Sequence, residues 1–347
     1  MWRSAGLGFG AAVAFWPGWT SAAITPRWAL IAVGSPLVAW LDPRRVEPLV
    51  LAALVLVLIY ATLSLAYTPD PLTGIGGMIH LLILASAFLM GASLSTVEPL
   101  LLGVAWGLSV SAILAVIQVA SGWSPVDQAI APAGLFFNRL ILGETIAPLL
   151  AWAVVSQRIT LSVILGVGLV ASQSRVGIVA AIVGVSVVNW RRAWPLPFVA
   201  AILATLAYLF GWTPFTADRL ASFGQRLEIW SDAIRGLTLW GDGIGAFQTR
   251  FPRWEFAHSD FLQAGYELGV VGLTFVSGAI ILGWRRSTRN PLRAAIAALG
   301  IVGLFSFSLQ LPMLAFVACV LAGHLSRVGA PLRGLPSLGR GDHGAYV

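Results

Sequence analysis

The chain has 347 residues, of which 58% are hydrophobic and only 10% are charged. Soluble domains contain roughly 25% charged residues, so this composition excludes a soluble globular protein. The apolar residues form runs of about 15 to 24 residues, which predicts a polytopic all-α membrane protein. Every basic residue is arginine, and the net charge of +7 indicates cytoplasmic loops rather than nucleic-acid binding. The single cysteine excludes a disulfide framework and a cysteine-based metal site.

About twelve apolar segments follow one another along the chain, and each is a candidate transmembrane helix. They cover residues 5–20, 27–40, 46–67, 75–92, 97–120, 138–157, 159–173, 175–190, 194–212, 261–284, 294–309 and 311–326. We expect residues 1–328 to form a single integral membrane domain, with one large outer loop at 213–260 between the ninth and tenth spans. Residues 329–347 are rich in glycine and proline, so we expect them to form a disordered cytoplasmic tail.

Arginine positions predict the orientation of these spans, because cytoplasmic loops of membrane proteins carry an excess of basic residues. Placing both termini in the cytoplasm puts thirteen of the 21 arginines on the inner side, in agreement with twelve spans. Eight arginines then lie on the outer side: Arg27, Arg139, Arg175, Arg219, Arg226, Arg235, Arg250 and Arg253. Two interpretations remain open for them. Each extends its side chain to the membrane surface, or several share an anionic ligand.

The outer loop holds five of these eight arginines, and its first half has the pattern of a helix. Ser222 followed by Gln225 matches a capping box, and Gly236 suits the C-terminal end. One face of this helix carries, at helical spacing, Arg226, Trp230, Ala233 and Leu237. An arginine on an apolar face requires an anion or a carboxylate as its partner.

The segment Gly241-Asp-Gly-Ile-Gly-Ala-Phe247 follows, and its alternating glycines permit positive φ angles. It predicts a tight turn rather than a nucleotide-binding loop, because no strand precedes it. His258 stands just before the tenth span, where Asp260 with Gln263 resembles a helix N-cap. The positive end of a helix dipole disfavours imidazolium, so we expect a neutral ring near neutral pH and a plausible general base.

Several of these segments resemble the O-antigen ligase and polymerase family of bacterial inner membranes. Arg226-Leu-Glu-Ile-Trp230 and the glycine segment resemble the family's Arg-x-x-x-Trp helix and its Gly-x-Gly-x-Gly-x-Phe turn. The stretch His258-Ser-Asp-Phe-Leu-Gln263 with Glu267-Leu-Gly-Val-Val-Gly272 resembles the family's His-(Asn/Ser)-x-x-Leu-Gln and Glu-x-Gly-x-x-Gly segments. Upstream, Ser174-Arg175-Val-Gly177 resembles a Ser-Arg-x-(Gly/Ala) motif, and Phe137-Asn138-Arg139 resembles an earlier Asn-containing segment. The resemblance covers residues 130–275, whereas the first 120 residues match only in hydropathy.

The resemblance implies a GT-C-like fold and a glycosyltransferase that uses no nucleotide sugar and no cofactor. The donor would be a glycan on undecaprenyl pyrophosphate, presented at the periplasmic face. The acceptor would be a lipid A-core hydroxyl in a ligase, or the end of another lipid-linked repeat in a polymerase. By position, Arg175 and Arg226 would bind the pyrophosphate and His258 would activate the acceptor. Further candidates for substrate contact are Arg139, Glu144, Trp230, Arg250 and Arg253.

The chemistry of these residue types agrees with the resemblance. Breaking a sugar–pyrophosphate bond develops negative charge, which fixed guanidinium groups stabilise without Mg²⁺. A base activates the weakly nucleophilic acceptor hydroxyl and contributes roughly 10²- to 10⁴-fold in rate. The sequence has no Asp-x-Asp motif and no His/carboxylate cluster, so we expect no metal. A single attack on the anomeric carbon would invert its configuration.

Alternative functions remain open. Ligase is favoured over polymerase because His258 lies in a base-like setting, although the motifs alone do not divide the two. A transporter or flippase for an anionic lipid-linked substrate would predict broken spans in pseudo-symmetric halves, and no such repeat stands out. A structural scaffold would leave the outer arginines without a ligand.

Overall fold

The structure is a computed structural model, and it describes residues 2–15, 24–39, 41–125, 130, 132–188, 217–254, 256–288 and 290–327, except for the side chains of 217–223. These residues form helices and loops, with two isolated β-bridges and no strand among them. The helices are α1 (Trp2–Val13), α2 (Thr25–Val38), η1 (Pro43–Arg45), α3 (Pro48–Ser64), α4 (Pro71–Ser93), α5 (Glu98–Ser121), α6 (Arg139–Val155), α7 (Ile159–Ser172), α8 (Arg175–Val188), α11 (Ala217–Arg235), α12 (Ala246–Arg250), α13 (Asp260–Arg286), α14 (Asn290–Phe305), η2 (Ser308–Gln310) and α15 (Pro312–Leu325).

Eleven of the twelve predicted spans coincide with a helix. The ninth predicted span, at 194–212, and the predicted tail, at 329–347, lie outside the described residues. Within the described residues, α4, α5 and α13 are long and apolar enough to cross a bilayer, and five further apolar helices are shorter. The protein is therefore a helical membrane protein.

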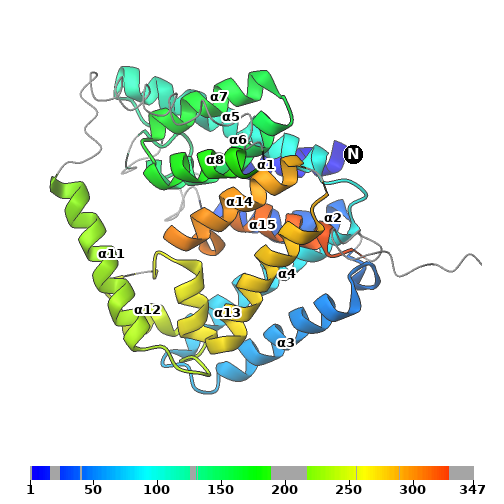
Figure 1. Cartoon of the computed structure of the whole chain (residues 1–347), viewed down its shortest axis with the longest axis vertical. Helices are drawn as coiled ribbons and strands as arrows, with labels where there is room; N and C mark the ends of the chain where they lie inside the picture. The colour runs from blue at the N-terminus through cyan, green and yellow to red at the C-terminus, as the bar shows by residue number, and fades with distance from the viewer. Residues whose placement is uncertain are drawn as a thin grey trace, which may run out of the picture.

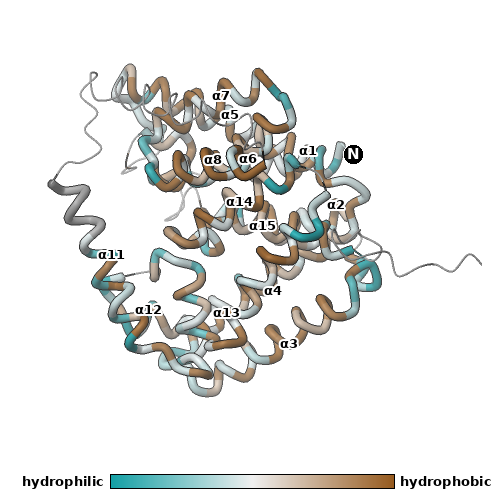
Figure 2. Tube along the Cα trace, in the orientation of Figure 1, coloured by the Kyte–Doolittle hydropathy of each residue, from teal (hydrophilic) through white to brown (hydrophobic). Residues whose placement is uncertain are grey.

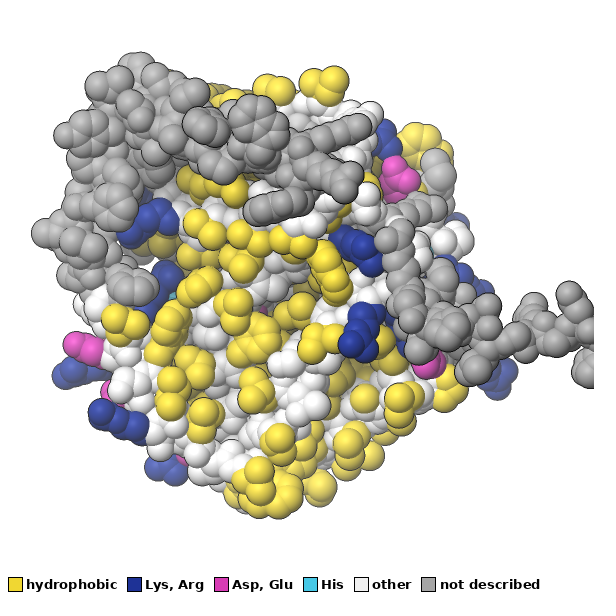
Figure 3. All heavy atoms as spheres, viewed as in Figure 1, with side chains coloured by type: hydrophobic (Ala, Val, Ile, Leu, Met, Phe, Trp, Pro, Cys, Tyr) yellow, Lys and Arg dark blue, Asp and Glu magenta, His cyan; other side chains and the backbone are white. Residues whose placement is uncertain are grey.

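The predicted outer loop differs in character from the spans. It supplies α11 and α12, and the coloured part of α11 in Figure 2 is more hydrophilic than α3 or α4. Figure 3 shows charged side chains gathered along the lower left margin, over α11 and α12, beside a broad hydrophobic face. The loop is therefore more polar than the apolar helices beside it.

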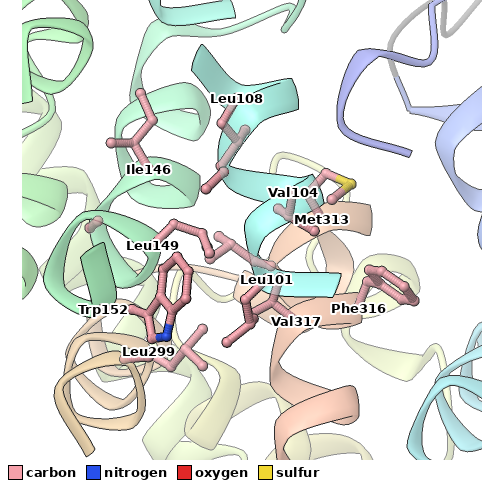
Figure 4. Packing of buried hydrophobic residues seen from close by; sticks show 14 of the residues in the cluster. Leu101, Val104, Leu108, Ile146, Leu149, Trp152, Leu299, Met313, Phe316 and Val317 are labelled. Carbon is pink, nitrogen blue, oxygen red and sulfur yellow. The ribbon is translucent and has the colours of Figure 1, made fainter. Parts of the chain in front are cut away.

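The core lies where α5, α6, α14 and α15 meet (Figures 1 and 4). Buried side chains from these four helices interlock there, and they include Leu101, Val104, Leu108, Ile146, Leu149, Trp152, Leu299, Met313, Phe316 and Val317. Small residues allow backbone contact between α15 and α4. The two backbones lie so close at Gly323 that an added Cβ atom would overlap the carbonyl oxygen of Phe88. Such close approaches are typical of membrane helices, which associate by packing rather than by the hydrophobic effect.

The loops at the predicted inner ends contact one another. Arg45 donates to the Ser93 carbonyl oxygen over 2.9 Å. Arg158 forms an ion pair with Glu98 at 2.7 Å. These contacts join the α2–α3, α4–α5 and α6–α7 connections, which the arginine distribution places together on the cytoplasmic side.

The loops at the predicted outer ends form a separate group. The Thr68 hydroxyl donates to the Ile244 carbonyl oxygen over 2.9 Å. Arg139 donates from Nη1 to Gln173 Oε1 over 3.1 Å. The α3–α4 connection thus meets the glycine turn, and the start of α6 meets the α7–α8 connection. Which of the two groups faces the cytoplasm stays a prediction.

α13 is broken at Gly269, whose φ of 58° and ψ of −145° are not helical. Backbone groups near the break pair with the segment that precedes α12. Asp242 N–H donates to the Tyr266 carbonyl oxygen over 2.9 Å. Val270 N–H donates to the Leu239 carbonyl oxygen over 3.0 Å. Since buried backbone groups must be paired, the outer loop and the tenth span form one hydrogen-bonded unit.

We predict that Gly269→Ala destabilises the protein by about 2 kcal/mol or more, because an L-residue in the left-handed region costs roughly 1–2 kcal/mol before any overlap. The added Cβ would also overlap the Leu239 carbonyl oxygen. Thermal unfolding in detergent should show a transition lowered by several degrees. Gly278→Ala is the matched control, since it lies in the same helix with no atom within 4 Å of its added Cβ. Equal unfolding temperatures for the two variants would contradict this account of the break.

Candidate functional site

The side of α11 that carries Arg226 faces the rest of the protein, as its spacing predicts, and Arg226 itself is half-buried. Ile229 and Ala233, on the same side of the helix, are buried, whereas Leu237 beyond its end is exposed. Arg226 donates from Nη1 to the carbonyl oxygen of Phe305 over 3.1 Å. The partner is a neutral backbone group, so this hydrogen bond itself does not neutralise the guanidinium.

Two predicted helix starts are wrong. α11 begins at Ala217, so Ser222 lies inside the helix and has no capping position to fill. α13 begins with Ser259 as its N-cap, and the Ser259 hydroxyl accepts from Leu262 N–H at 3.5 Å. Asp260 is instead the first helical residue, and its carboxylate is buried. The predicted C-terminal end of α11 is confirmed, since the helix ends one residue before Gly236.

The glycine turn has the conformation that its sequence predicts. Gly241, Gly243 and Gly245 have φ angles of 72°, 98° and 77°. Ile244 between them is buried, and its N–H donates to the Ser64 hydroxyl oxygen over 3.0 Å. The turn therefore packs against the end of α3 and carries α12 next to α13.

His258 lies just before the N-cap of α13 in a left-handed conformation, with φ of 52°. Few non-glycine residues adopt this region, so the surrounding structure must hold it there. The ring meets Phe307 edge to face, with centroids 5.1 Å apart. His258 Nδ1 is buried and has no hydrogen-bond partner among the described residues. Packing thus fixes the ring and leaves one of its nitrogens buried without a hydrogen bond among the described residues.

Residues 305–309 run from the end of α14 into η2, and they contact several residues of the candidate site. No motif in the sequence points to them. The Ser306 hydroxyl donates to Glu144 Oε2 over 2.7 Å. The Ser308 hydroxyl donates to the Asp260 carboxylate. Only the alternation of phenylalanine and serine along this segment could have indicated two differently used faces.

This connecting segment (residues 305–309) brings together side chains from three parts of the chain. Glu144 comes from α6, Arg226 from α11, and His258 and Asp260 from the start of α13. Arg226 interacts electrostatically with both Glu144 and His258. A cation, a buried carboxyl group and an imidazole are therefore neighbours, although they are far apart in the sequence.

Arg139 and Arg175 occupy the first positions of α6 and α8. Asn138 caps α6 and accepts the N–H of Leu140 at 2.8 Å, and Ser174 lies in the equivalent position before α8. The Arg139–Gln173 hydrogen bond ties the two helix starts together. α6 also carries Glu144, so it links this pair of arginines to the connecting segment.

The other candidate residues have different surroundings. Arg250 and Arg253 are exposed, and Arg250 forms a loose ion pair with Asp242 at 3.9 Å. Trp230 donates from Nε1 to the Ala257 carbonyl oxygen over 3.0 Å. Trp230 therefore holds the backbone next to His258.

Arg27 shows that not every outer arginine needs a ligand. Its side chain is 1% exposed and donates to the carbonyl oxygens of Ala12 and Leu135, each over 3.1 Å. It also lies 4.0 Å from the centre of the Phe136 ring. Arg27 thus ties α1, α2 and the segment before α6 together, rather than extending to the membrane surface.

Burial and the nearby Arg226 cation, in that order, lower the pKa of His258 from its ordinary value of 6.5. Both effects disfavour the charged imidazolium. The neutral ring that the sequence predicts is therefore supported, but for a different reason. Burial is the larger cause of the lowered pKa, whereas the sequence-based expectation rested on the helix dipole.

A cavity of roughly 250 Å³ adjoins this region on the side of α13. Asp260, Gln263 and Ser308 line it near the connecting segment, and mostly apolar side chains of α3, α4, α13, α14 and α15 line the remainder. Within the described ranges, no group of three or more His, Cys, Asp or Glu residues could hold a metal ion.

Residues 160–277 match the family described as O-Antigen ligase. The matched region contains Arg175, Arg226 and His258 and leaves Arg139 and Glu144 outside it. No curated protein matches the chain.

We predict that the neutral form of His258 persists well below pH 6.5, because burial and Arg226 both oppose protonation. Diethyl pyrocarbonate modifies only neutral imidazole, so its rate at His258 can be followed against pH by peptide mass spectrometry. The midpoint should lie below that of free N-acetylhistidine and should move upward in Arg226→Gln. A midpoint that is insensitive to this substitution would mean that Arg226 does not act on His258.

Proposed function

From the assignment to the O-antigen ligase and polymerase family, we propose that this protein is a glycosyltransferase that moves a glycan from undecaprenyl pyrophosphate to an acceptor hydroxyl. Its most fitting activity is that of an O-antigen ligase with lipid A-core as acceptor. The observation that carries the proposal is the meeting of Arg226 and a neutral His258 at one connecting segment.

The arginines suit a pyrophosphate leaving group. Arg226 is half-buried, and its described hydrogen-bond partner is a neutral carbonyl, so its charge can attract an anion. Arg175 stands at the start of α8, where the helix dipole also favours negative charge. Guanidinium groups bind phosphate oxygens in a bidentate manner and never lose their charge. We assign the pyrophosphate to Arg175 and Arg226, with Arg139, Arg250 and Arg253 as further candidates.

His258 suits the role of general base. In the proposed step the ring takes the proton of the acceptor hydroxyl while that oxygen attacks the anomeric carbon. The bond between this carbon and the pyrophosphate oxygen breaks, and the pyrophosphate leaves with the bonding pair. One displacement of this kind inverts the anomeric configuration. The reaction requires no metal in this scheme, because arginine stabilises the leaving group.

The cavity beside α13 supports a lipid-linked donor. Its apolar lining suits the hydrocarbon chain of such a donor, and its polar lining at Asp260 and Ser308 lies next to the connecting segment. A chain bound there would place its pyrophosphate near the membrane surface, at the level of the candidate site. Glu144 and Trp230 would then border the glycan.

The proposal also includes the fold and the cellular location of the protein. We place the protein in the bacterial inner membrane as a GT-C-like bundle of about twelve spans, with both termini in the cytoplasm. Residues 1–328 would form one integral membrane domain, and the loop at 213–260 would face the periplasm.

Polymerase activity is the second candidate within the family, because the geometry at His258 would serve either acceptor. A transporter or flippase is more distant, since it would leave a buried neutral imidazole beside a cation without a role. Reconstitution separates these functions. We predict that purified protein with a lipid-linked glycan consumes lipid A-core and yields a ligated product. Lengthening of the lipid-linked glycan would indicate a polymerase, and movement of the donor across the vesicle without a new glycosidic bond would indicate a flippase.

In the same assay His258→Ala should reduce turnover by about 10²- to 10⁴-fold, the usual contribution of a general base. Binding of the donor should persist, because the arginines remain. The unfolding temperature of the variant serves as the control for folding. Full turnover by this variant would remove His258 from the reaction.

We predict that Arg226→Ala weakens donor binding by at least about tenfold, since hydrogen bonds to charged groups contribute roughly 1.5–3 kcal/mol. The matched control is Arg235→Ala on the same helix. Arg235 is 80% exposed at its side chain and has only a loose ion pair with Asp232 at 3.9 Å. Equal effects of the two substitutions would indicate general electrostatic attraction rather than a site.

A further inference from the structure

The backbone beside His258 is held from two directions. Ala257 is buried, and its carbonyl oxygen accepts from Trp230 Nε1 over 3.0 Å. Its N–H donates to Gln263 Oε1 over 3.5 Å. Because His258 has a left-handed φ of 52°, a conformation with a cost of roughly 1–3 kcal/mol in non-glycine residues, contacts on its neighbour decide whether it stays there.

Gln263 is itself oriented by a buried carboxylate. Its amide Nε2 donates to Glu267 Oε1 over 3.1 Å, and both side chains are buried. The two residues are four positions apart on α13, so they lie on one face of the helix. An amide has one donor end and one acceptor end. Glu267 therefore turns the oxygen of Gln263 toward Ala257.

Glu267 is in turn fastened to the glycine turn. Its Oε2 accepts from Gly245 N–H over 3.1 Å. Its backbone carbonyl oxygen accepts from Gly243 N–H over 2.9 Å. Glu267 thus accepts from two backbone N–H groups of the turn, one at its side chain and one at its own carbonyl oxygen.

We propose that Gln263 and Glu267 are positioning residues, which transmit the position of the glycine turn to His258 through one hydrogen-bonded chain. The chain runs from Gly245 through Glu267 and Gln263 to Ala257. This inference rests on the proposed function only in giving His258 a catalytic role. The spacing of these residues suits such a chain. Gln263 and Glu267 are one helical turn apart, and the Gln263 side chain contacts Ala257, which precedes the helix.

The hydrogen-bonded chain can be tested by exchanging the amide and the carboxylate between positions 263 and 267, because an amide has a donor end and an acceptor end. In Gln263→Glu two carboxylates face each other. In Glu267→Gln the amide of Gln263 must rotate or lose its acceptor, and a rotated amide presents its NH₂ group to Ala257 N–H. In the double variant, Gln263→Glu with Glu267→Gln, a carboxylate at 263 accepts from Ala257 and from the new amide at 267. That amide still presents its oxygen to Gly245, so all three hydrogen bonds can form again.

The wild type and these three variants are compared by donor KM, kcat, the rate of His258 modification by diethyl pyrocarbonate, and the unfolding temperature. Each single variant should lower kcat about tenfold with donor KM within about twofold, as expected for an effect on the base rather than on binding. Each should also raise the modification rate of His258 relative to His80 and His324. The double variant should return kcat and the modification rate to within about threefold of the wild type, which is the non-additivity of a coupled pair.

Two results would overturn the proposal. One is a double variant no better than the worse single variant. The other is an unchanged His258 modification rate in all four proteins, which would leave Gln263 and Glu267 as a clamp that affects only the unfolding temperature. The modification rate does not depend on turnover. If the wild type transfers no glycan but the modification rates follow the predicted order, the positioning chain stands and the proposed function fails.

Discussion

The break of α13 at Gly269 is the constraint on which the rest of the candidate site depends. A transmembrane helix satisfies its own backbone, and an interruption in the bilayer is tolerated only where other protein groups replace the lost partners. Here the outer loop supplies them, through Leu239 and Asp242. The loop is therefore docked against a span at a fixed height. Arg226 on α11 belongs to this loop, so its position relative to α13 is fixed as well.

The distribution of partners around the site separates two kinds of polar group. The carboxyl groups of Glu144 and Asp260 each receive a serine hydroxyl from the connecting segment. Among the described residues Arg226 is half-buried and donates one hydrogen bond, to a carbonyl oxygen, while Glu144 lies near enough to interact with its charge. Its other N–H groups can donate to a ligand, and under the proposed function that ligand is the pyrophosphate.

The sequence predicted some parts of this site well and others poorly. The positive φ angles of the glycine turn follow from alternating glycines, and the inward face of α11 follows from helical spacing. The starts of α11 and α13 were misplaced, because Ser222 and Asp260 have the residue types of caps but lie inside helices. The connecting segment was missed entirely. Its serines and phenylalanines are ordinary membrane-helix residues, and only their neighbours in space give them a function.

The sequence by itself determined the class of the protein, the positions of eleven helices and the residues that resemble a glycosyltransferase family. These properties depend on local composition and on periodicity, which are visible along the chain. Only the tertiary structure decided which of these arginines is enclosed by carbonyl oxygens and which is not. Arg27 and Arg226 have the same charge and the same predicted side of the membrane, yet Arg27 is enclosed by the carbonyl oxygens of Ala12 and Leu135. The difference arises from contacts between segments remote in the sequence, and no local pattern encodes those contacts.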